Sequence, residues 1–290
     1  MEYTEQFNRY KRLADESIME FLPKPQEGFA VLAEAMEYAL LGGGKRIRPV
    51  LLLAVCEMFG GELNHARPAA AAIEMVHAYS LVHDDLPAMD NDDLRRGRPT
   101  VHKMFGEDIA ILAGDALLTR AFEAAAQIPN EAAAAKAALC LAKGAGCEGM
   151  VAGQVIDLQS EGKDGLTYEH LKQMDLLKTG ALIRTAGKIG GILGRASDAE
   201  LALIDRYCSA LGLAFQIQDD ILDVTGSEEF GKPIGSDVQK GKATYVTILG
   251  LDQARELSGR LTDAAVEAAR ELPGGEFLVE LAFHLLHRNQ

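Results

Sequence analysis

Apolar residues recur every three or four positions along almost the whole chain, which is the spacing of helices with one buried face. No run alternates between apolar and polar residues in the way that a half-buried strand requires. Breaks are expected where glycine and proline cluster, and the longest such stretch runs from Gly226 to Gly241. The pattern predicts helices over residues 4–22, 27–41, 48–59, 67–86, 108–127, 131–160, 168–193, 198–224 and 243–271. We therefore predict an all-α fold.

The composition is that of one large globular domain. No proline- or serine-rich linker divides the 290 residues, and 48% of them are hydrophobic, so we expect residues 1–290 to share a single core. No apolar run approaches the ~18 residues of a membrane span, and the polar start does not resemble a secretory signal. The four cysteines form no CxxC pair, which favours reduced thiols. We expect a cytoplasmic protein without stable membrane insertion.

The charge balance restricts the partners. With 29 basic and 43 acidic residues, the formal net charge is −14. A nucleic-acid partner is therefore not expected, because a phosphate backbone demands a basic face. An anionic substrate would have to be held by metal ions or by local basic clusters that overcome the general repulsion.

Two short acidic motifs lie inside otherwise apolar helical sequence. Their carboxylates are those of Asp84, Asp85 and Asp90 in the first motif and of Asp219, Asp220 and Asp223 in the second. Two carboxylates about 4 Å apart repel each other by roughly 4 kcal/mol at an effective dielectric constant near 20. Such clusters are tolerated when a cation lies between them, and an all-oxygen ligand set suits a hard ion such as Mg²⁺.

The two motifs differ in geometry. Asp219 and Asp223 are four residues apart, so a helix places them about 40° apart on one face. Asp84 and Asp90 are six apart, which leaves them roughly 120° apart on a straight helix. Pro87 should end or loosen the helix just before it and bring Asp90 back towards Asp84. One acidic run alone would be read as a solvated helix face, but two within apolar sequence favour a metal site.

Several segments resemble the trans-isoprenyl diphosphate synthase family, most closely its bacterial farnesyl diphosphate synthases. They are GGGKRIRP at 42–49, EMVHAYSLVHDDLPAMDNDDLRRGRPT at 74–100, AGDALL at 113–118, GQVIDL at 153–158, KTGALI at 178–183, AFQIQDDILD at 214–223, GK at 231–232 and GKATY at 241–245. The resemblance implies a single polyprenyl synthase domain, folded as a helical bundle around a deep central cavity and assembled as a homodimer. It also implies small-molecule diphosphate substrates.

The resemblance implies a head-to-tail prenyl transfer. An allylic diphosphate, dimethylallyl or geranyl, loses diphosphate, and the double bond of isopentenyl diphosphate attacks the resulting cation. The departing anion needs electrostatic stabilisation, for which three Mg²⁺ ions are implied. Their ligands would be Asp84, Asp85, Asp90, Asp219 and Asp223. The implied catalytic set is Asp84, Asp90, Arg95, Lys178, Thr179, Gln216, Asp219 and Lys232.

Two diphosphate sites are implied as well. The allylic diphosphate is assigned to Arg95, Lys178, Thr179, Gln216, Lys232 and Lys242. Isopentenyl diphosphate is assigned, without metal, to Lys45, Arg48, His77 and Arg96. Taken alone, the Gly-Lys-Arg run at Lys45 is more typical of a solvated helix start, and His77 of a structural histidine. Thr179 and Gln216 alone would be ordinary polar helix residues.

Product length is expected to depend on Tyr79. Each added five-carbon unit buries more apolar surface, at about 0.8 kcal/mol per CH₂, so growth continues until the cavity is blocked. Tyr79 lies five residues before Asp84, more than one turn along the helix, whereas the neighbouring Ser80 is small. In the resembled family an aromatic residue there marks C15 synthases, so farnesyl diphosphate is the expected product. The alternatives are a C20 geranylgeranyl product and a Tyr79 that merely packs in the core.

Other classes of protein fit less well. A class I terpene cyclase would need no second diphosphate site, and its second metal motif usually carries Asn, Ser and Glu. A non-catalytic partner subunit of another synthase tends to lose one aspartate motif, whereas this chain has both. A calcium-binding helical protein is not indicated, because no EF-hand loop occurs.

Overall fold

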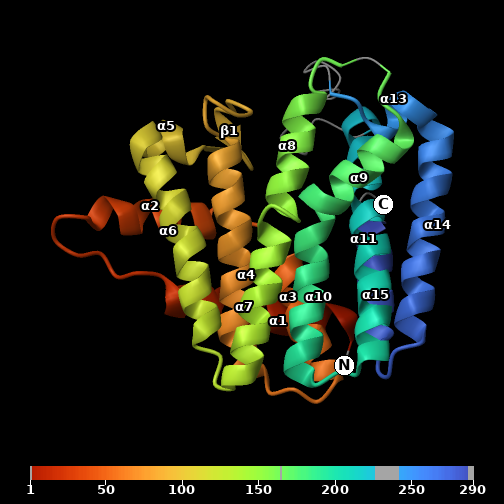
Figure 1. Ribbon diagram of the computed structural model, residues 1–290, viewed down its shortest axis with the longest axis horizontal. Coiled ribbons are helices and arrows are strands. Elements are labelled where there is room, and N and C mark those ends of the chain that lie inside the picture. Colours follow the sequence, from red (N-terminus) through yellow and green to blue (C-terminus); the bar gives the residue numbers. More distant parts are fainter. Residues whose placement is uncertain (1, 164, 226–241, 287–290) are drawn as a thin grey trace. The chain divides into compact units, whose positions relative to one another are not determined.

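The computed structural model describes residues 2–163, 165–225 and 242–286 (Figure 1). Its helices are α1 (Tyr3–Phe21), α2 (Ala30–Leu41), α3 (Ile47–Met58), α4 (Leu63–Asp84), α5 (Val101–Phe105), α6 (Glu107–Ala126), α7 (Glu131–Ala145), α8 (Met150–Ser160), α9 (Tyr168–Lys178), α10 (Gly180–Gly194), α11 (Asp198–Thr225), α13 (Tyr245–Leu249), α14 (Leu251–Arg270) and α15 (Glu276–Leu286). The strands within these ranges are β1 (Leu94–Arg95) and β2 (Arg98–Pro99), which pair with each other. The predicted all-α fold is confirmed.

The chain separates into two compact units. The first comprises Met1–Leu139 with Ile192–Gly194, and the second comprises Cys140–Gly191 with Arg195–Gln290. The expectations of one domain and of a deep central cavity stay predictions. Within the described ranges, no helix is long and apolar enough to cross a lipid bilayer.

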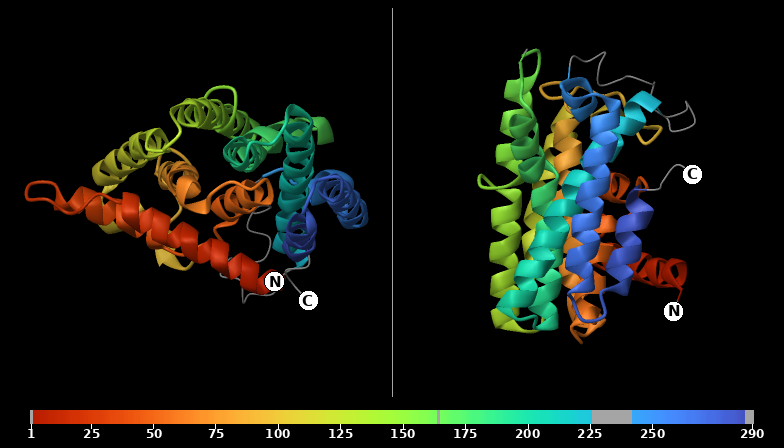
Figure 2. Two further views of the ribbon diagram at one scale, coloured as in Figure 1. Left: turned by 90° about the horizontal axis from the view of Figure 1, so that it is seen from below. Right: turned by 90° about the vertical axis from the view of Figure 1, so that its right-hand side faces the viewer.

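In the first unit, α4 is the most enclosed helix. It packs against α1, α2, α3 and α6, and Figure 2 shows these neighbours from two further directions. Its run Ala69–Ala72 is fully covered, because alanines let the adjoining helices approach closely. Leu51, Leu52 and Leu53 of α3 are also fully buried on successive positions. A helix that is apolar on every side is one surrounded by protein, which both helices are.

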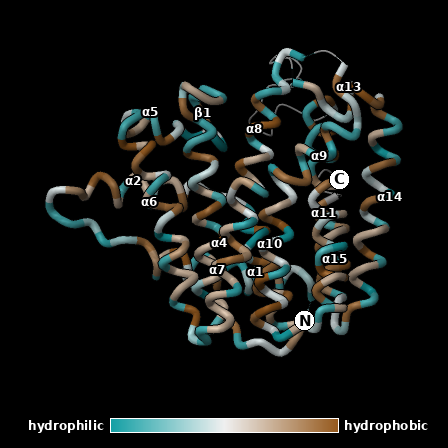
Figure 3. The backbone as a smooth tube through the Cα atoms, viewed as in Figure 1, coloured by the Kyte–Doolittle hydropathy of each residue, from teal (hydrophilic) through white to brown (hydrophobic). Residues whose placement is uncertain are grey.

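In the second unit, α11 is the central element. It packs against α9, α13, α14 and α15. Leu213, Ile217 and Ile221 of α11 form a core cluster with Leu171 of α9 and Tyr245 of α13. Figure 3 shows polar and apolar residues alternating along α14, as expected for a helix with one face in water. The core of this unit therefore surrounds α11, whose residues Ala210 to Ala214 are all buried.

Three predicted helices are interrupted in the structure. The segment 131–160 breaks between α7 and α8, where Gly146 and Gly149 lie, and 168–193 breaks at Thr179. The segment 243–271 breaks at Gly250, whose φ of 83° is left-handed and favours glycine. The sequence analysis predicted no helix for α15, because its short, nearly continuous apolar run has no clear period.

Two glycines of the second unit allow helices to touch. A Cβ at Gly153 of α8 would lie 2.2 Å from the backbone nitrogen of Lys178 in α9. A Cβ at Gly144 of α7 would lie 1.9 Å from the hydroxyl of Thr185 in α10. Both glycines therefore serve close helix packing, and Gly153 keeps α8 against the end of α9.

We predict that Gly153→Ala lowers the free energy of unfolding by about 1–3 kcal/mol, because the methyl group meets backbone that cannot rotate away. The matched control is Gly259→Ala in α14, where nothing lies within 4 Å. Replacing that exposed helical glycine should raise stability by about 0.5–1 kcal/mol. Urea denaturation of both variants measures the difference, and equal effects would contradict the close contact at Gly153.

Candidate functional site

The first acidic motif lies at the end of α4, in the first unit. The helix stops at Asp84, three residues before Pro87. The chain then turns back, so that the amide of Asp90 donates to the carbonyl of Asp84 at 2.9 Å. The amide of Asn91, with φ of 51°, donates to the carbonyl of Leu86 at 3.1 Å and closes the turn. The expectation that the helix ends before Pro87 and returns Asp90 to Asp84 is confirmed.

Asp85 forms an ion pair with Arg95 of β1. Its two oxygens accept from Nε at 2.8 and 2.9 Å, and Oδ1 also accepts from Nη2 at 2.6 Å. Burial raises the pKa of Asp85, while the Arg95 guanidinium opposes that rise. The pair holds Arg95 beside the first motif, whereas Asp84 and Asp90 are half-buried. The predicted contact of Asp85 with a metal stays a prediction.

The second acidic motif lies on the last turns of α11, in the second unit. Asp219 and Asp223 are half-buried and one turn apart, as predicted. Asp220 is buried, and its Oδ2 accepts from the backbone amide of Tyr245 at 2.8 Å. Asp220 thus fastens the start of α13 to α11, which leaves the other two carboxylates as the candidate ligands of this motif.

The carboxylates of the two motifs have the chemistry of a Mg²⁺ site. Nowhere in the described part of the chain do three His, Cys, Asp or Glu side chains converge closely enough to hold an ion. Carboxylates that repel one another are expected to stay apart until a cation joins them. The four half-buried aspartates offer only oxygen atoms, which fits a hard cation, and their role as ligands stays a prediction. They are Asp84, Asp90, Asp219 and Asp223.

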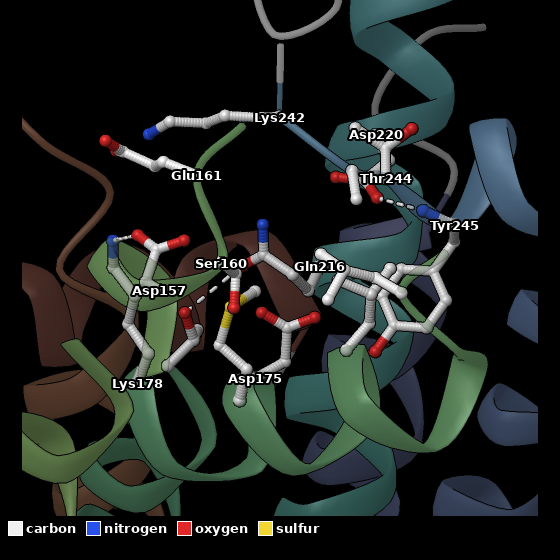
Figure 4. A pocket seen from close by; sticks show the side chains of 15 residues that line it. Asp157, Ser160, Glu161, Asp175, Lys178, Gln216, Asp220, Lys242, Thr244 and Tyr245 are labelled. Carbon is white, nitrogen blue, oxygen red and sulfur yellow. Dashed lines mark hydrogen bonds and ion pairs between the residues drawn. The ribbon is translucent and has the colours of Figure 1, made fainter. Parts of the chain in front are cut away.

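A pocket of about 200 Å³ opens within the second unit (Figure 4). Four of the residues assigned to the allylic diphosphate line it, namely Lys178, Thr179, Gln216 and Lys242. The ammonium of Lys178 pairs with Asp157 at 2.5 Å. The hydroxyl of Thr179 donates to Oε1 of Gln216 at 3.1 Å, which ties the break between α9 and α10 to α11. The structure therefore brings these four predicted residues together, while Lys232 lies outside the described residues.

Asp175 and Tyr245 line the same pocket and were missed by the sequence analysis. Burial raises the pKa of Asp175 to about 7; the nearby charge of Asp157 acts in the same direction, and Tyr245 and Lys178 oppose it. Burial also raises the pKa of Tyr245, and the charge of Asp175 adds to that effect. The available sequence signal was a single aspartate within an apolar stretch of helix, which cannot by itself reveal the partner.

A cluster of arginines surrounds His77 in the first unit. Burial lowers the pKa of His77 well below its usual value, and the charges of Arg48, Arg96, Arg95 and Arg46 lower it further. His77 is therefore a neutral ring among cations. Three of the four residues assigned to isopentenyl diphosphate therefore lie near one another, since the charges of Arg48 and Arg96 affect the pKa of His77.

The glycine loop before α3 completes this cluster. Arg96 donates to the carbonyl of Gly43. A Cβ on Gly44 would lie 2.7 Å from the Arg96 guanidinium, and the φ of 134° at Gly44 also requires glycine. The exposed Lys45 follows directly. Burial lowers the pKa of Arg48; the charge of Glu74 opposes that fall, and the charge of Arg96 adds to it.

The proposed length-determining residues lie one turn before the first motif. Tyr79 is only 7% exposed, and its ring meets that of His83 edge to face at 5.8 Å between centroids. The hydroxyl of Ser80 donates to the carbonyl of His77 at 2.8 Å, so it is occupied by its own helix. Tyr79 is thus a large, fixed ring, and its role as a floor stays a prediction.

Comparison with known proteins gives a consistent result. A family model described as "Polyprenyl synthetase" matches residues 29–272. The chain is 50% identical over 240 residues to the heterodimeric geranylgeranyl pyrophosphate synthase large subunit 1, chloroplastic, of Arabidopsis thaliana, covering 80% of this chain and 65% of that protein. It is 46% identical to the chloroplastic geranylgeranyl pyrophosphate synthase of Catharanthus roseus, covering 88% of this chain and 73% of that one. The chain therefore spans roughly two thirds of the length of these relatives.

Two crystal structures resemble the chain over nearly its full length. One is the geranylgeranyl pyrophosphate synthetase of Pyrococcus horikoshii Ot3, at 34% identity and a TM-score of 0.90, covering 100% of both chains. The other is an apo FPP/GFPP synthase of Zymomonas mobilis, at 35% identity and a TM-score of 0.87, covering 98% of this chain and 100% of that one.

We predict that Asp175→Asn stabilises the protein more at pH 8 than at pH 5. The folded pKa of Asp175, about 7, lies above its unfolded value. Its stabilising contribution is therefore fully present below about pH 4 and is lost as the pH rises through about 7. An uncharged asparagine avoids this loss, so the difference in unfolding free energy should grow by at most about 1.4 kcal/mol per pH unit.

Urea denaturation at the two pH values measures this effect. The matched control is Asp263→Asn, which changes an exposed aspartate of α14 and should have the same small effect at both. A pH-independent difference for Asp175→Asn would show that the carboxyl is charged in the folded protein throughout.

Proposed function

Because the chain belongs to the polyprenyl synthetase family, we propose that it joins an allylic diphosphate to isopentenyl diphosphate head to tail. The predicted isoprenoid-synthase fold is confirmed by the structural neighbours. The observation that carries the proposal is the arginine cluster around His77 in the first unit, together with a pocket in the second unit that Lys178 and Lys242 line. Two separate places with basic side chains suit a reaction with two diphosphate substrates.

The site around His77 is assigned to isopentenyl diphosphate. Arg48 and Arg96 provide planar guanidinium groups that suit bidentate contacts with phosphate oxygens, and Lys45 adds a flexible charge. Free backbone amides at the start of α3 point in the direction that favours an anion. A neutral His77 can donate one hydrogen bond without adding another positive charge to the cluster.

The pocket in the second unit is assigned to the allylic substrate. Lys178 is oriented by Asp157, and Lys242 adds a second ammonium on the pocket wall. Thr179 and Gln216 hold each other, so a hydroxyl and an amide oxygen can face a developing carbocation without reacting with it. Arg95, oriented by Asp85, and Lys232 are assigned to the same diphosphate. The released diphosphate is the proposed proton acceptor, so no side chain is named as base.

Magnesium is the proposed cofactor, with three ions per active site. Its ligands would come from Asp84, Asp90, Asp219 and Asp223, the half-buried carboxylates of the two motifs. When bound, Mg²⁺ supplies electrostatic stabilisation of the leaving diphosphate. Asp85 and Asp220 are assigned to holding Arg95 and Tyr245, because the structure already engages both carboxylates in that way.

We propose geranylgeranyl diphosphate, C20, as the product. The relatives with the highest identity carry the name geranylgeranyl pyrophosphate synthase, which supports C20 over the C15 product that the sequence analysis preferred. Farnesyl diphosphate is the second candidate, and the buried ring of Tyr79 is the observation that favours it. The C15 and C20 candidates differ in whether the ring of Tyr79 blocks the extension from C15 to C20.

A second copy of the chain is the proposed partner. The outer surface of α6 exposes the large apolar side chains of Ile111 and Leu112, which favours association. The Arabidopsis relative is named as the large subunit of a heterodimer, so a different partner subunit is the alternative. Sedimentation of the purified chain at several concentrations distinguishes a self-associating protein from one that stays monomeric.

The direct test is incubation of the purified protein with Mg²⁺, isopentenyl diphosphate and each allylic primer, followed by sizing of the products. We expect turnover that depends on Mg²⁺ and a C20 product from every accepted primer. A C15 end product would select the second candidate. Absence of turnover with every primer would contradict the proposal and favour a non-catalytic partner subunit.

We predict that Asp84→Asn and Asp219→Asn each lower kcat by at least the order of 10²-fold, as for the loss of one preorganised electrostatic contact. The two residues serve different motifs, so similar losses would indicate one shared function. Asp263→Asn, which removes an exposed carboxylate from α14, is the matched control and should keep normal turnover. Near-normal kcat in either motif variant would remove that residue from the proposed machinery.

For the second candidate, farnesyl diphosphate, we predict that Tyr79→Ala lengthens the product by at least one five-carbon unit, because the loss of the ring opens space for further apolar chain. Ser80→Ala is the control from the same helical turn. Its hydroxyl bonds only to its own helix in the structure, so its removal should leave product length unchanged. Reversed-phase chromatography of the dephosphorylated products measures both, and an unaltered length in Tyr79→Ala would exclude the ring as the floor.

A further inference from the structure

The side chain of Arg46 joins three helices of the first unit at a single point. Arg46 precedes α3 and is only 6% exposed. Its Nε donates to Asp15 of α1 at 2.9 Å, its Nη1 to Glu74 of α4 at 2.8 Å, and its Nη2 to the carbonyl of Leu40 in α2 at 2.6 Å. The planar guanidinium thus directs its three nitrogen atoms to three different elements.

This arrangement fixes a backbone conformation that Arg46 would not choose alone. Its φ of 54° and ψ of 32° are left-handed, which costs a residue with a Cβ roughly 1 kcal/mol or more. A guanidinium that is buried must also keep its anionic partners, because removing one leaves an uncompensated charge. The three contacts therefore determine where the glycine loop ends and where α3 begins.

The residues on either side of Arg46 are those assigned to phosphate. Lys45 precedes it directly, and Arg48 lies in the first turn of α3. Glu74 of α4, which pairs with Arg46, also raises the pKa of Arg48 and Arg96 by its negative charge. A shift of Arg46 would consequently move Lys45, the free amides of α3 and the counter-charge of the cluster together.

We propose that Arg46 is a positioning residue for the site around His77, and that Asp15 couples the docking of α1 to diphosphate binding there. The identification of the ligand as a diphosphate rests on the proposed function. Coupling between two sites is reciprocal in free energy, so a diphosphate bound at the cluster stabilises the docked α1 to the same extent that α1 strengthens binding.

The first experiment compares two variants that each remove one link between α1 and the rest of the first unit. Asp15→Asn removes the carboxylate on Arg46, whereas Arg67→Gln removes the ion pairs of α4 with Glu16 and Glu20, neither of which touches the glycine loop. We expect Asp15→Asn to raise KM for isopentenyl diphosphate about tenfold, with kcat and the allylic KM changed less than about threefold. Arg67→Gln should leave all three constants near wild type.

The second experiment measures the reciprocal effect without catalysis. Inorganic pyrophosphate is added to the full chain in the presence of a metal chelator, and hydrogen exchange of the α1 amides is followed. We expect pyrophosphate to slow exchange in the wild type and in Arg67→Gln, but not in Asp15→Asn. Protection of α1 only in the proteins that retain Asp15 supports the coupling even if the wild type forms no prenyl product.

If the ion pair between Asp15 and Arg46 only stabilises the fold, a different result is expected. Asp15→Asn would then unfold more readily, but it would bind isopentenyl diphosphate normally and show the same pyrophosphate protection as Arg67→Gln. That outcome overturns the inference while leaving the proposed function intact, provided that the wild type turns over. Equal increases in both KM values would overturn it as well, because the effect would not be confined to one site.

Discussion

A charge buried between apolar helices has to be neutralised, and that requirement organises both units of the protein. Desolvation of an ion costs several kcal/mol, so each buried charge needs a partner of opposite sign or a bound ligand. Asp85 is paired with Arg95, Lys178 with Asp157, and Arg46 with two carboxylates. These pairs hold the frame of each candidate site in place, so they are part of the structure before any substrate arrives.

Other charged groups are the ones to which the proposed function assigns chemistry. Around His77, burial lowers the pKa of both Arg48 and Arg96 although the charge of Glu74 opposes that fall, and an added anion would favour their charged forms further. The acidic motifs have the opposite excess, since four half-buried carboxylates would be stabilised by added cations. In the proposed function, a pair of diphosphates and a set of Mg²⁺ ions would supply both, which would reconcile anionic substrates with a net charge of −14.

Sequence reasoning succeeded where the determining physics is local. The helices follow from apolar spacing, and the return of Asp90 to Asp84 follows from the steric effect of Pro87 on its own turn. The position of Asp219 and Asp223 on one helical face needs only the pitch of a helix. The breaks at Thr179 and Gly250 were missed because apolar spacing continues across them, although packing or backbone conformation ends the helix.

The other parts of the sites depend on contacts between residues far apart in sequence. Arg46 and Asp15 are 31 residues apart, and Asp220 is 25 residues from the amide of Tyr245 that it accepts from. No periodic pattern in the sequence indicates such pairs. The hydrogen bond of Asp220 to the Tyr245 amide and the burial of Asp175 are therefore evident only from the fold. Product length has the same limit, since one ring at Tyr79 favours C15 whereas relatedness over most of the chain favours C20.

We propose that two diphosphates and Mg²⁺ neutralise these opposite excesses of charge. The decisive experiment is a crystal structure with Mg²⁺, isopentenyl diphosphate and an unreactive allylic thiolodiphosphate. We expect one diphosphate against Arg48 and Arg96 without metal contact, and the other bound to Mg²⁺ that Asp84 and Asp219 coordinate. Well-ordered ligands with both aspartates free of metal, or with the arginine cluster free of diphosphate, would contradict it.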